Sequence, residues 1–273
     1  MASEISLSSA VRDNLLALKD TQTLISRTQN RLSTGLKVSS AIDDPRIYFE
    51  AKALSDQASD IQEKKEGVDQ AISSVSTALQ AIESIDSLVQ QMKGLLISAK
   101  TATGNELASI QDQYNELRTQ IDNLASDAKY QGLSLVDGTG STLEVSFSTD
   151  TASVLTINSV DMTIGTAGLS LTSAANFSLA SNIDAALTEV TAATSTLRGE
   201  AKELGSNIAI LQTRLDFTNN YVNLLQTGSS KLTLADITEE GANLVALQTR
   251  QQIGISALSF AGQSEQAVLQ LFR

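Results

Sequence analysis

The fold follows from residues 183–225, IDAALTEVTAATSTLRGEAKELGSNIAILQTRLDFTNNYVNLL, in which apolar residues recur at alternating intervals of four and three positions. The repeating positions are Ile183, Leu187, Val190, Thr194, Leu197, Ala201, Leu204, Ile208, Leu211, Leu215, Thr218, Val222 and Leu225. Eleven of the thirteen are apolar, and no proline interrupts them. A mean spacing of 3.5 predicts one long helix that supercoils left-handedly against its neighbours.

The first helical segment outside this stretch covers residues 11–32. Its predicted seam consists of Val11, Leu15, Leu18, Ile25 and Leu32. Gln22 and Gln29 occupy the intervening positions, where buried amides could fix the register of a coiled coil.

Two more helical stripes follow. Residues 61–99 keep a seven-residue ladder of Ile61, Val68, Val75, Ile82, Val89 and Leu96, flanked by Ile72, Leu79, Ile85 and Met92. A stripe over residues 107–124 consists of Leu107, Ile110, Tyr114, Leu117, Ile121 and Leu124. The short connection TATGN at 101–105 predicts that the second stripe runs antiparallel to the first.

Helix boundaries are indicated by glycine, proline and acidic residues. Gly35 follows the first seam as a C-terminal cap would, and Asp44-Pro45 is typical of an N-cap and first helical residue. Gly228 is expected to end the long helix. Asp236 with Glu239 resembles a capping box that opens a last helix over residues 237–273.

The helical period vanishes between Gly132 and residue 175, where apolar and polar residues alternate. We expect short strands around Leu133/Leu135, Leu143/Val145/Phe147, Val154/Leu155/Ile157 and Val160/Met162/Ile164. The predicted fold is therefore mainly α: a long antiparallel, coiled-coil helical bundle with paired terminal helices and a small β-hairpin excursion in the middle of the chain.

Composition excludes several functions. The 273 residues contain no His and no Cys, and the formal net charge is −12. Without imidazole or thiolate, Ser-His-Asp triads and the common zinc sites are ruled out, and we expect no enzyme, no catalytic residue, no metal and no cofactor. Asp43-Asp44 and Glu239-Glu240 are interpreted as helix caps or first-turn charges. An acidic chain is also poorly suited to nucleic acid.

The first thirty residues lack the basic region, apolar run and cleavage site of a secretory signal peptide. No apolar run approaches the length of a membrane span, so we expect no membrane insertion. If the protein is exported, we expect a route without a cleaved signal peptide.

The last helix has apolar residues on two faces, one with Leu244, Ile255, Leu258 and Leu269, the other with Ile253, Ala257, Phe260, Ala267 and Leu271. One partner helix cannot bury both, so we expect other copies of the chain to cover and order the terminal arms. The predicted polymer contacts are Leu7, Val11, Leu15, Leu18, Ile25, Leu32, Leu244, Ile253, Ile255, Leu258, Phe260, Val268, Leu269, Leu271 and Phe272.

Two segments resemble a known family. NRLSTGLKVSSAIDD at residues 30–44 resembles the N-terminal signature of bacterial flagellins, and ALSFAGQSEQAVLQLFR at 257–273 resembles their C-terminal signature. The resemblance covers residues 1–135 and 180–273, with only a short middle in place of large outer domains. It implies an extracellular structural subunit of the flagellar filament that polymerises with itself for swimming motility.

The resemblance also implies a division of the chain and a set of partners. The implied division is an inner N-terminal arm (1–40), outer-domain helices (41–131), a variable β-rich tip (132–175), a long outer-domain helix (176–228) and an inner C-terminal arm (229–273). The implied partners are a type III export chaperone, the filament cap and hook-filament junction proteins. A hairpin near residues 132–147 is implicated, by the same resemblance, in switching between filament states.

Many flagellins engage a vertebrate Toll-like receptor through a stretch that matches VQQMKGLLISA at residues 89–99, which includes Gln90. Leu95 agrees with the receptor-activating pattern. Gln91 and Gln113 depart from it, since the family pattern has an arginine and a glutamate there. These departures count against recognition.

Two alternatives to a filament subunit remain. A hook-filament junction protein shares the terminal helical pattern, although signatures at both ends favour the filament subunit. A secreted helical translocator belongs to a different class and would need an apolar hairpin long enough to enter lipid, which the sequence lacks.

Overall fold

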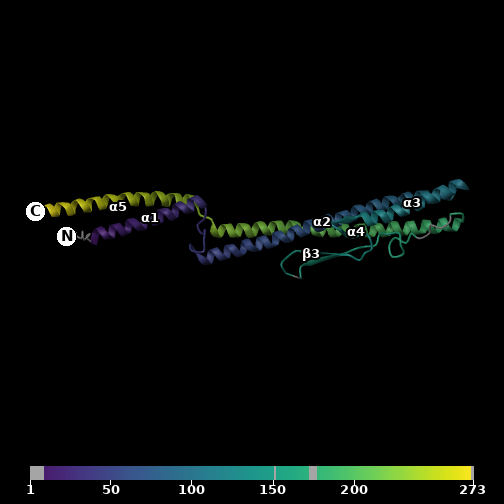
Figure 1. Ribbon diagram of the computed structural model, residues 1–273, viewed down its shortest axis with the longest axis horizontal. Helices are drawn as coiled ribbons and strands as arrows, with labels where there is room; N and C mark the ends of the chain where they lie inside the picture. Colours follow the sequence, from purple (N-terminus) through teal and green to yellow (C-terminus); the bar gives the residue numbers. More distant parts are fainter. Residues whose placement is uncertain (1–8, 151, 172–176, 272–273) are drawn as a thin grey trace. The chain divides into compact units, whose positions relative to one another are not determined.

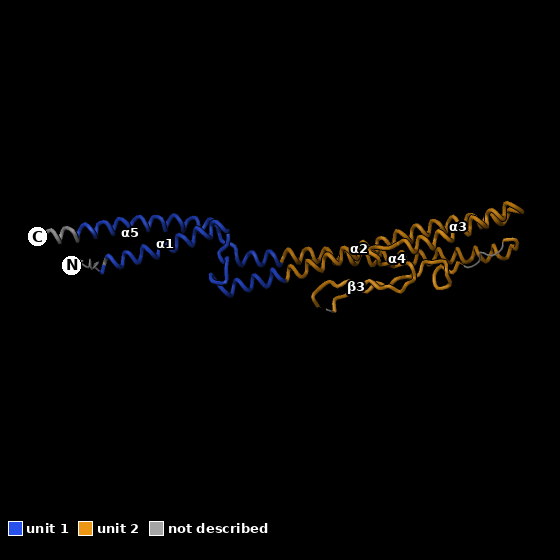
Figure 2. The backbone as a smooth tube through the Cα atoms, in the orientation of Figure 1, with its two compact units in different colours: residues 1–56, 225–273 blue, residues 57–224 orange. Residues whose placement is uncertain are grey.

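The computed structural model describes residues 9–150, 152–171 and 177–271. The chain divides into two compact units, residues 1–56 with 225–273 (unit 1) and residues 57–224 (unit 2), coloured separately in Figure 2. The helices are α1 (Ser9–Thr34), α2 (Pro45–Ala99), α3 (Asn105–Asp127), α4 (Ala180–Thr233) and α5 (Ile237–Leu271). The strands are β1 (Lys129–Tyr130), β2 (Leu133–Ser134), β3 (Thr142–Ser146) and β4 (Val154–Asn158). The mainly α fold with a small β excursion is confirmed.

Unit 2 has its core along the seam of the two long helices. All thirteen stripe positions of residues 183–225 are buried or half-buried in α4, and the ladder of α2 is buried as well. Helix α3 lies beside them (Figure 1) and adds Ile110, Tyr114 and Ile121 to the same cluster. The sequence interval of 3.5 therefore predicted the buried faces correctly, because a seam of that period stays on one side of a supercoiled helix.

The middle segment forms two hairpins. Strands β1 and β2 pair antiparallel, and β3 pairs with β4 so that Leu143 lies opposite Ile157. Buried side chains of this segment join the helical core, among them Val145 and Ile157. The residues that we expected at an exposed tip thus contribute to the hydrophobic cluster of unit 2.

The fourth expected strand, Val160/Met162/Ile164, is wrong. The amides of Val160 and Met162 donate to the carbonyls of Leu135 and Val136 at 2.8 and 3.0 Å, but only a single bridge forms there. The Asp161 carboxylate accepts the Thr163 amide at 2.9 Å, which turns the chain. A side chain that competes for backbone donors ends the ladder at this point.

Unit 1 pairs α1 with α5 (Figure 1). We call these two helices the arm pair. They run antiparallel, because Arg31 at the end of α1 meets Glu240 at the start of α5 while Leu18 lies against Gly254 further on. In α1 the buried or half-buried seam positions are Val11, Asn14, Leu18, Thr21, Ile25, Thr28 and Leu32. In α5 they are Glu240, Leu244, Leu247, Gln251, Gly254 and Leu258.

The predicted seam of α1 is wrong at its intermediate positions. Leu15, Gln22 and Gln29 are exposed, and Asn14, Thr21 and Thr28 occupy the seam instead. The three-residue step precedes the four-residue step in this helix, which places the intermediate seam position one residue earlier. Gln22 still bridges the helices at the rim, where its Oε1 accepts a hydrogen bond from Gln251 at 2.7 Å.

Most predicted helix boundaries are confirmed. Gly35 has a φ of 71°, and its amide donates to the Arg31 carbonyl at 2.8 Å. Asp44 accepts the Ile47 amide at 3.1 Å, and Asp236 accepts the Thr238 amide at 2.8 Å. Both carboxylates therefore satisfy N–H groups that the first helical turn leaves unpaired.

Gly228 does not end the long helix, because α4 continues to Thr233. The Thr233 carbonyl accepts the Lys37 amide at 2.7 Å, and Leu36 forms a bridge with Leu234. The last carbonyl of α4 thus finds its partner in the segment after α1, and no glycine cap is needed. The helices α2 and α4 both continue without interruption across the boundary between unit 1 and unit 2. The five-part domain division stays a prediction.

Candidate assembly surface

The arm pair uses only part of its apolar surface within one chain. Outside its seam, eight large apolar side chains are between 44% and 73% exposed. They are Leu15, Leu16 and Leu24 on α1, and Ile237, Val245, Ile253, Ile255 and Phe260 on α5. Exposed apolar residues that gather on two paired helices are typical of an interaction surface, whereas scattered ones need no explanation.

The predicted polymer contacts fall into three groups. Val11, Leu18, Ile25, Leu32, Leu244 and Leu258 are buried or half-buried in the arm pair. Leu15, Ile253, Ile255 and Phe260 are exposed and available to another molecule. Leu7 and Phe272 lie outside the described residues, and so do the side chains of Val268, Leu269 and Leu271.

Four exposed residues of this surface were missed by sequence reasoning, namely Leu16, Leu24, Ile237 and Val245. They lie off the predicted 3.5-residue stripes. Their exposure becomes evident only when the phases of the α1 and α5 seams are known, because these phases decide which residues of each helix the partner helix covers.

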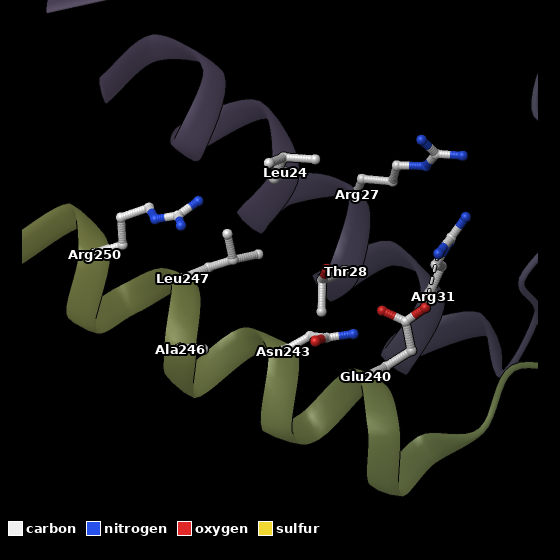
Figure 3. A pocket seen from close by; sticks show the side chains of 9 residues that line it. All are labelled: Leu24, Arg27, Thr28, Arg31, Glu240, Asn243, Ala246, Leu247 and Arg250. Atoms are coloured by element: carbon white, nitrogen blue, oxygen red, sulfur yellow. Dashed lines mark hydrogen bonds and ion pairs between the residues drawn. The ribbon is translucent and has the colours of Figure 1, made fainter. Parts of the chain in front are cut away.

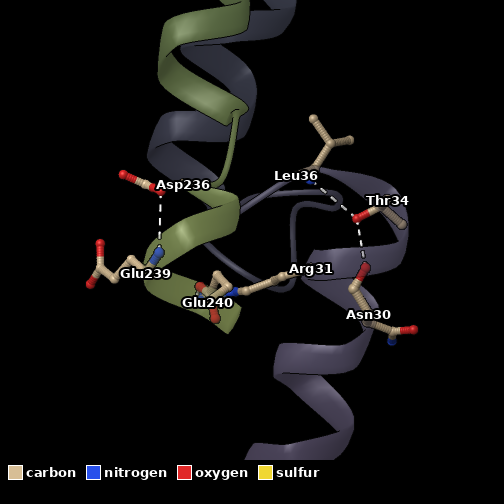
Figure 4. Close-up of polar contacts among 7 residues, drawn as sticks. All are labelled: Asn30, Arg31, Thr34, Leu36, Asp236, Glu239 and Glu240. Carbon is tan, nitrogen blue, oxygen red and sulfur yellow. Dashed lines mark hydrogen bonds and ion pairs between the residues drawn. The ribbon is translucent and has the colours of Figure 1, made fainter. Parts of the chain in front are cut away.

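The end of α1 and the start of α5 are joined by an ion pair, shown in Figure 4. Arg31 donates from Nη1 to Glu240 Oε1 at 2.7 Å, and the two side chains are only 20% and 9% exposed. Glu240 is therefore a cross-helix partner as well as a first-turn charge. A hydrogen bond between charged groups with little water around it holds the two helix ends in one register.

The loop after α1 explains several residues of the first signature. Asp43 Oδ2 accepts hydrogen bonds from the amides and hydroxyls of Ser39 and Ser40 at 3.0 to 3.1 Å. These donors, the Ser39 amide first, lower the pKa of the Asp43 carboxyl because they stabilise its charged form. Asp43 therefore shapes the loop, and Asp44 caps α2.

A groove of about 390 Å³ opens between the two helices of the arm pair (Figure 3). Its lining residues are Leu24, Arg27, Thr28, Arg31, Glu240, Asn243, Ala246, Leu247 and Arg250. The groove thus has three guanidinium groups and one carboxylate, and that carboxylate is paired with Arg31. Arg27 and Arg250 give it a positive charge.

Charge is divided unevenly between the two units. Unit 2, residues 57–224, contains 9 Lys and Arg against 20 Asp and Glu. Unit 1 contains 10 Lys and Arg against 11 Asp and Glu and is nearly neutral. Copies of unit 1 can therefore approach one another with little net electrostatic repulsion, whereas the excess negative charge of unit 2 makes its copies repel one another.

The stretch that matches the receptor-binding region lines a second groove, of about 520 Å³, in unit 2. Helices α2 and α3 bring Gln91, Leu95 and Gln113 together in its wall, with Gly94, Glu116, Leu117 and Gln120. Gln90 does not line the groove, and its amide nitrogen lies 3.5 Å from Asp86 Oδ1. Gln91 and Gln113, which both depart from the family pattern, therefore line the same groove.

Within the described residues, no cluster of His, Cys, Asp and Glu is arranged to hold a metal ion. No helix in that part of the chain combines the length and the apolar character needed to cross a membrane.

Family models match both helical parts of the chain. Residues 5–141 match the bacterial flagellin N-terminal helical region, and residues 180–272 match the bacterial flagellin C-terminal helical region. The chain belongs to the bacterial flagellin family. It is a structural subunit of the flagellar filament and not an enzyme, and the unmatched residues 142–179 contain β3 and β4.

Curated flagellins are similar over nearly the whole chain. Flagellin FljO of Caulobacter vibrioides is 33% identical over 261 residues, which cover 94% of this chain and 93% of the relative. Flagellin FljM of the same organism is 32% identical over 258 residues with the same coverage. A flagellin of Brucella melitensis is 30% identical over 282 residues and covers both chains completely. This flagellin is thus a short form, of the same length as these relatives.

A solved structure shares the fold of this flagellin. A protein described as a candidate flagellar hook-associated protein of Vibrio parahaemolyticus aligns with a TM-score of 0.60 at 15% identity, over 70% of this chain and all of that one. At this identity the likeness concerns the fold alone.

Proposed function

We propose that this flagellin polymerises through the arm pair, with the exposed apolar faces of α1 and α5 as the contacts between copies. The observation that carries the proposal is the second face of each helix. Ile253 and Phe260 on α5, like Leu16 on α1, remain more than 60% exposed after the two helices have paired. Covering such side chains is worth about 1.5 to 3 kcal/mol each.

The near-neutral charge of unit 1 supports the same assignment. Interface cores are depleted of charged residues, and copies of unit 2 would have to overcome the repulsion of their excess carboxylates. In this proposal the arms form the inner contacts of the filament, and the acidic helices of residues 57–224 face outward.

The proposal also includes partner proteins for export and assembly. We infer an export chaperone that covers the C-terminal arm before assembly, a filament cap at the growing end and hook-filament junction proteins at the base. The exposed apolar residues of α5 support the chaperone, because such a surface needs a cover in a single copy. Export without a cleaved signal peptide belongs to the same proposal.

Seeded assembly tests the assignment. Purified full-length chain is mixed with short filament seeds, and growth is followed by electron microscopy and sedimentation. We expect the double variant Ile253→Gln, Phe260→Gln to lose at least tenfold in growth rate, because two apolar contacts are replaced by amides that must be desolvated.

The matched control is Leu179→Gln, which changes a side chain of similar exposure in unit 2. It should grow at the wild-type rate, and circular dichroism should show unchanged helix content for all variants. Wild-type growth by the α5 double variant would remove the arm pair from the polymer contacts, and failure of the wild type itself would contradict self-assembly.

A further inference from the structure

One face of α1 changes the sign of its charge along its length. Asp13, Leu16 and Asp20 are spaced by three and four residues, and Leu24 and Arg27 continue the same spacing. Residues at these intervals lie on one helical face. All five are exposed. Leu24 and Arg27 also line the groove between α1 and α5, whereas Asp13, Leu16 and Asp20 are not among its lining residues.

The N-terminal half of this face, which we call the acidic half, is an apolar side chain between two carboxylates. Leu16 is 61% exposed between Asp13 and Asp20. Neither carboxylate has an ion pair among the described residues. Arg12 and Lys19 lie on the adjoining face, so the negative charge belongs to the stripe of Asp13 and Asp20 alone.

The C-terminal half leads into the groove of the arm pair. Leu24 and Leu247 supply its apolar side chains, and Arg27 and Arg250 its unpaired guanidinium groups, as Figure 3 shows. Arg31 is already paired with Glu240. Within the described residues, Arg27 and Arg250 have no acidic partner at ion-pair distance, so the groove keeps about two positive charges beside the apolar side chains of Leu24, Ala246 and Leu247.

The acidic half and the groove are complementary but cannot meet in one chain. Asp20 and Arg27 are seven residues apart on the same rigid helix, about 10 Å at 1.5 Å per residue. Only a second molecule, displaced along the helix axis, brings carboxylates to the guanidinium groups.

We propose that the acidic half of α1 in one copy docks in the Arg27–Arg250 groove of a second copy, shifted lengthwise by roughly 7 to 14 residues or about 10 to 20 Å. Leu16 then lies over the Leu24 and Leu247 side, and Asp13 and Asp20 reach the guanidinium groups. The two patches differ, so the contact is heterologous. A heterologous contact that does not close into a ring produces an open polymer, which suits a filament.

This inference rests on self-assembly through the arms and adds the contact that sets the lengthwise register of neighbouring copies. Arginine and carboxylate form geometrically specific pairs, so charge would select the register while the apolar faces supply most of the binding.

Reciprocal charge reversal tests the contact. Variant A is Asp13→Arg with Asp20→Arg, and variant B is Arg27→Glu with Arg250→Glu. The growth rate is measured in seeded assembly, after filament ends made of wild-type seed have been replaced by ends made of the variant. Each variant alone should then elongate at least tenfold more slowly than the wild type, because like charges meet in every contact.

An equimolar mixture of A and B should recover elongation to within about threefold of wild type. The basic face of A fits the acidic groove of B, and the acidic face of B fits the basic groove of A. A chain with all four changes should likewise elongate alone. This rescue cannot come from a variant that has merely unfolded, and circular dichroism checks each fold.

The control for the added negative charge is Arg46→Glu with Lys52→Glu, exposed residues in the first turns of α2. Wild-type elongation by A or B alone would overturn the docking contact while leaving assembly through the arms intact. Absence of rescue in both the mixture and the fourfold variant would overturn it as well. Loss of growth in the wild type would instead contradict self-assembly.

Discussion

Several side chains in this molecule make contacts that their residue types alone do not predict. Arg31 and Glu240 lie 209 positions apart in the sequence and join the ends of α1 and α5 at 2.7 Å. Tyr114 of α3 is fully buried and packs edge-on against Phe177, with ring centroids 5.3 Å apart. Its hydroxyl has no hydrogen-bond partner in the described part of the chain.

Burial raises the pKa of Tyr114 from 10.0 to about 12. The unfolded chain therefore releases this proton first, so the stabilising contribution is complete below pH 10 and is lost as the pH rises through 12. We expect the free energy of unfolding of the wild type to fall by up to about 2 to 3 kcal/mol more than that of Tyr114→Phe over this window.

Urea unfolding at pH 7, 10 and 12, followed by circular dichroism, measures this difference. At pH 7 the variant should be as stable as the wild type or more stable, because it removes an unsatisfied buried hydroxyl. A loss of more than about 1 kcal/mol at pH 7 would show that the hydroxyl has a partner after all.

The α2–α4 and α1–α5 helix pairs differ in the composition of their seams. The α2–α4 seam of unit 2 is almost wholly apolar, and α3 covers it further. The α1–α5 seam alternates apolar residues with Thr21, Thr28 and Gln251, and it narrows at Gly254. A Cβ added at Gly254 would lie 3.1 Å from Leu18 Cδ2, so this glycine sets how closely the two arms approach.

Substitution of Gly254 separates helix propensity from packing. Gly241→Ala, where an added Cβ would meet no atom within 4 Å, should stabilise α5 by about 1 kcal/mol through helix propensity alone. Gly254→Ala should gain less, and Gly254→Val should destabilise the arm pair by about 1 to 3 kcal/mol because Leu18 must move.

Residue-resolved hydrogen exchange of α5 in the unpolymerised chain reports these effects. If Gly254→Val and Gly241→Val changed protection equally, the close approach of the arms at Gly254 would be refuted.

The molecule as a whole combines a well-packed acidic unit with a nearly neutral unit that keeps apolar surface exposed. Unit 2 has the hydrophobic core and most of the excess negative charge. Unit 1 has the arm pair, in which each helix covers one stripe of the other. Stability is therefore concentrated in residues 57–224, and the capacity to associate is concentrated in the arms.

Hydrogen exchange should reveal this division. In the unpolymerised chain, amides of residues 9–34 and 237–264 should exchange at least tenfold faster than those of residues 61–96 and 183–222, because fewer apolar contacts oppose local opening. Polymerisation should slow the arms to the rates of unit 2. Equally slow exchange of both regions before polymerisation would contradict the prediction that copies complete the arms.

Sequence periodicity by itself determined which segments form helices and the buried face of the three unit 2 helices. A 3.5-residue interval maintained over residues 183–225 has no other compact solution than a supercoiled helix against partners. Local capping chemistry at Gly35, Asp44 and Asp236 likewise depended only on neighbouring residues. These features are local, so the sequence alone was sufficient for them.

Only the tertiary structure decided the phase of the arm seam, the end of α4 and the fate of residues 160–164. A seam that begins with a three-residue step and one that begins with a four-residue step differ by one residue at every second position. Packing against α5 places Thr21, and not Gln22, in the seam. The Thr233 carbonyl is capped by Lys37, almost 200 positions away, which no local pattern encodes. The exposed faces of the arms follow from that phase, because residues are free for a second copy only where the first partner leaves them uncovered.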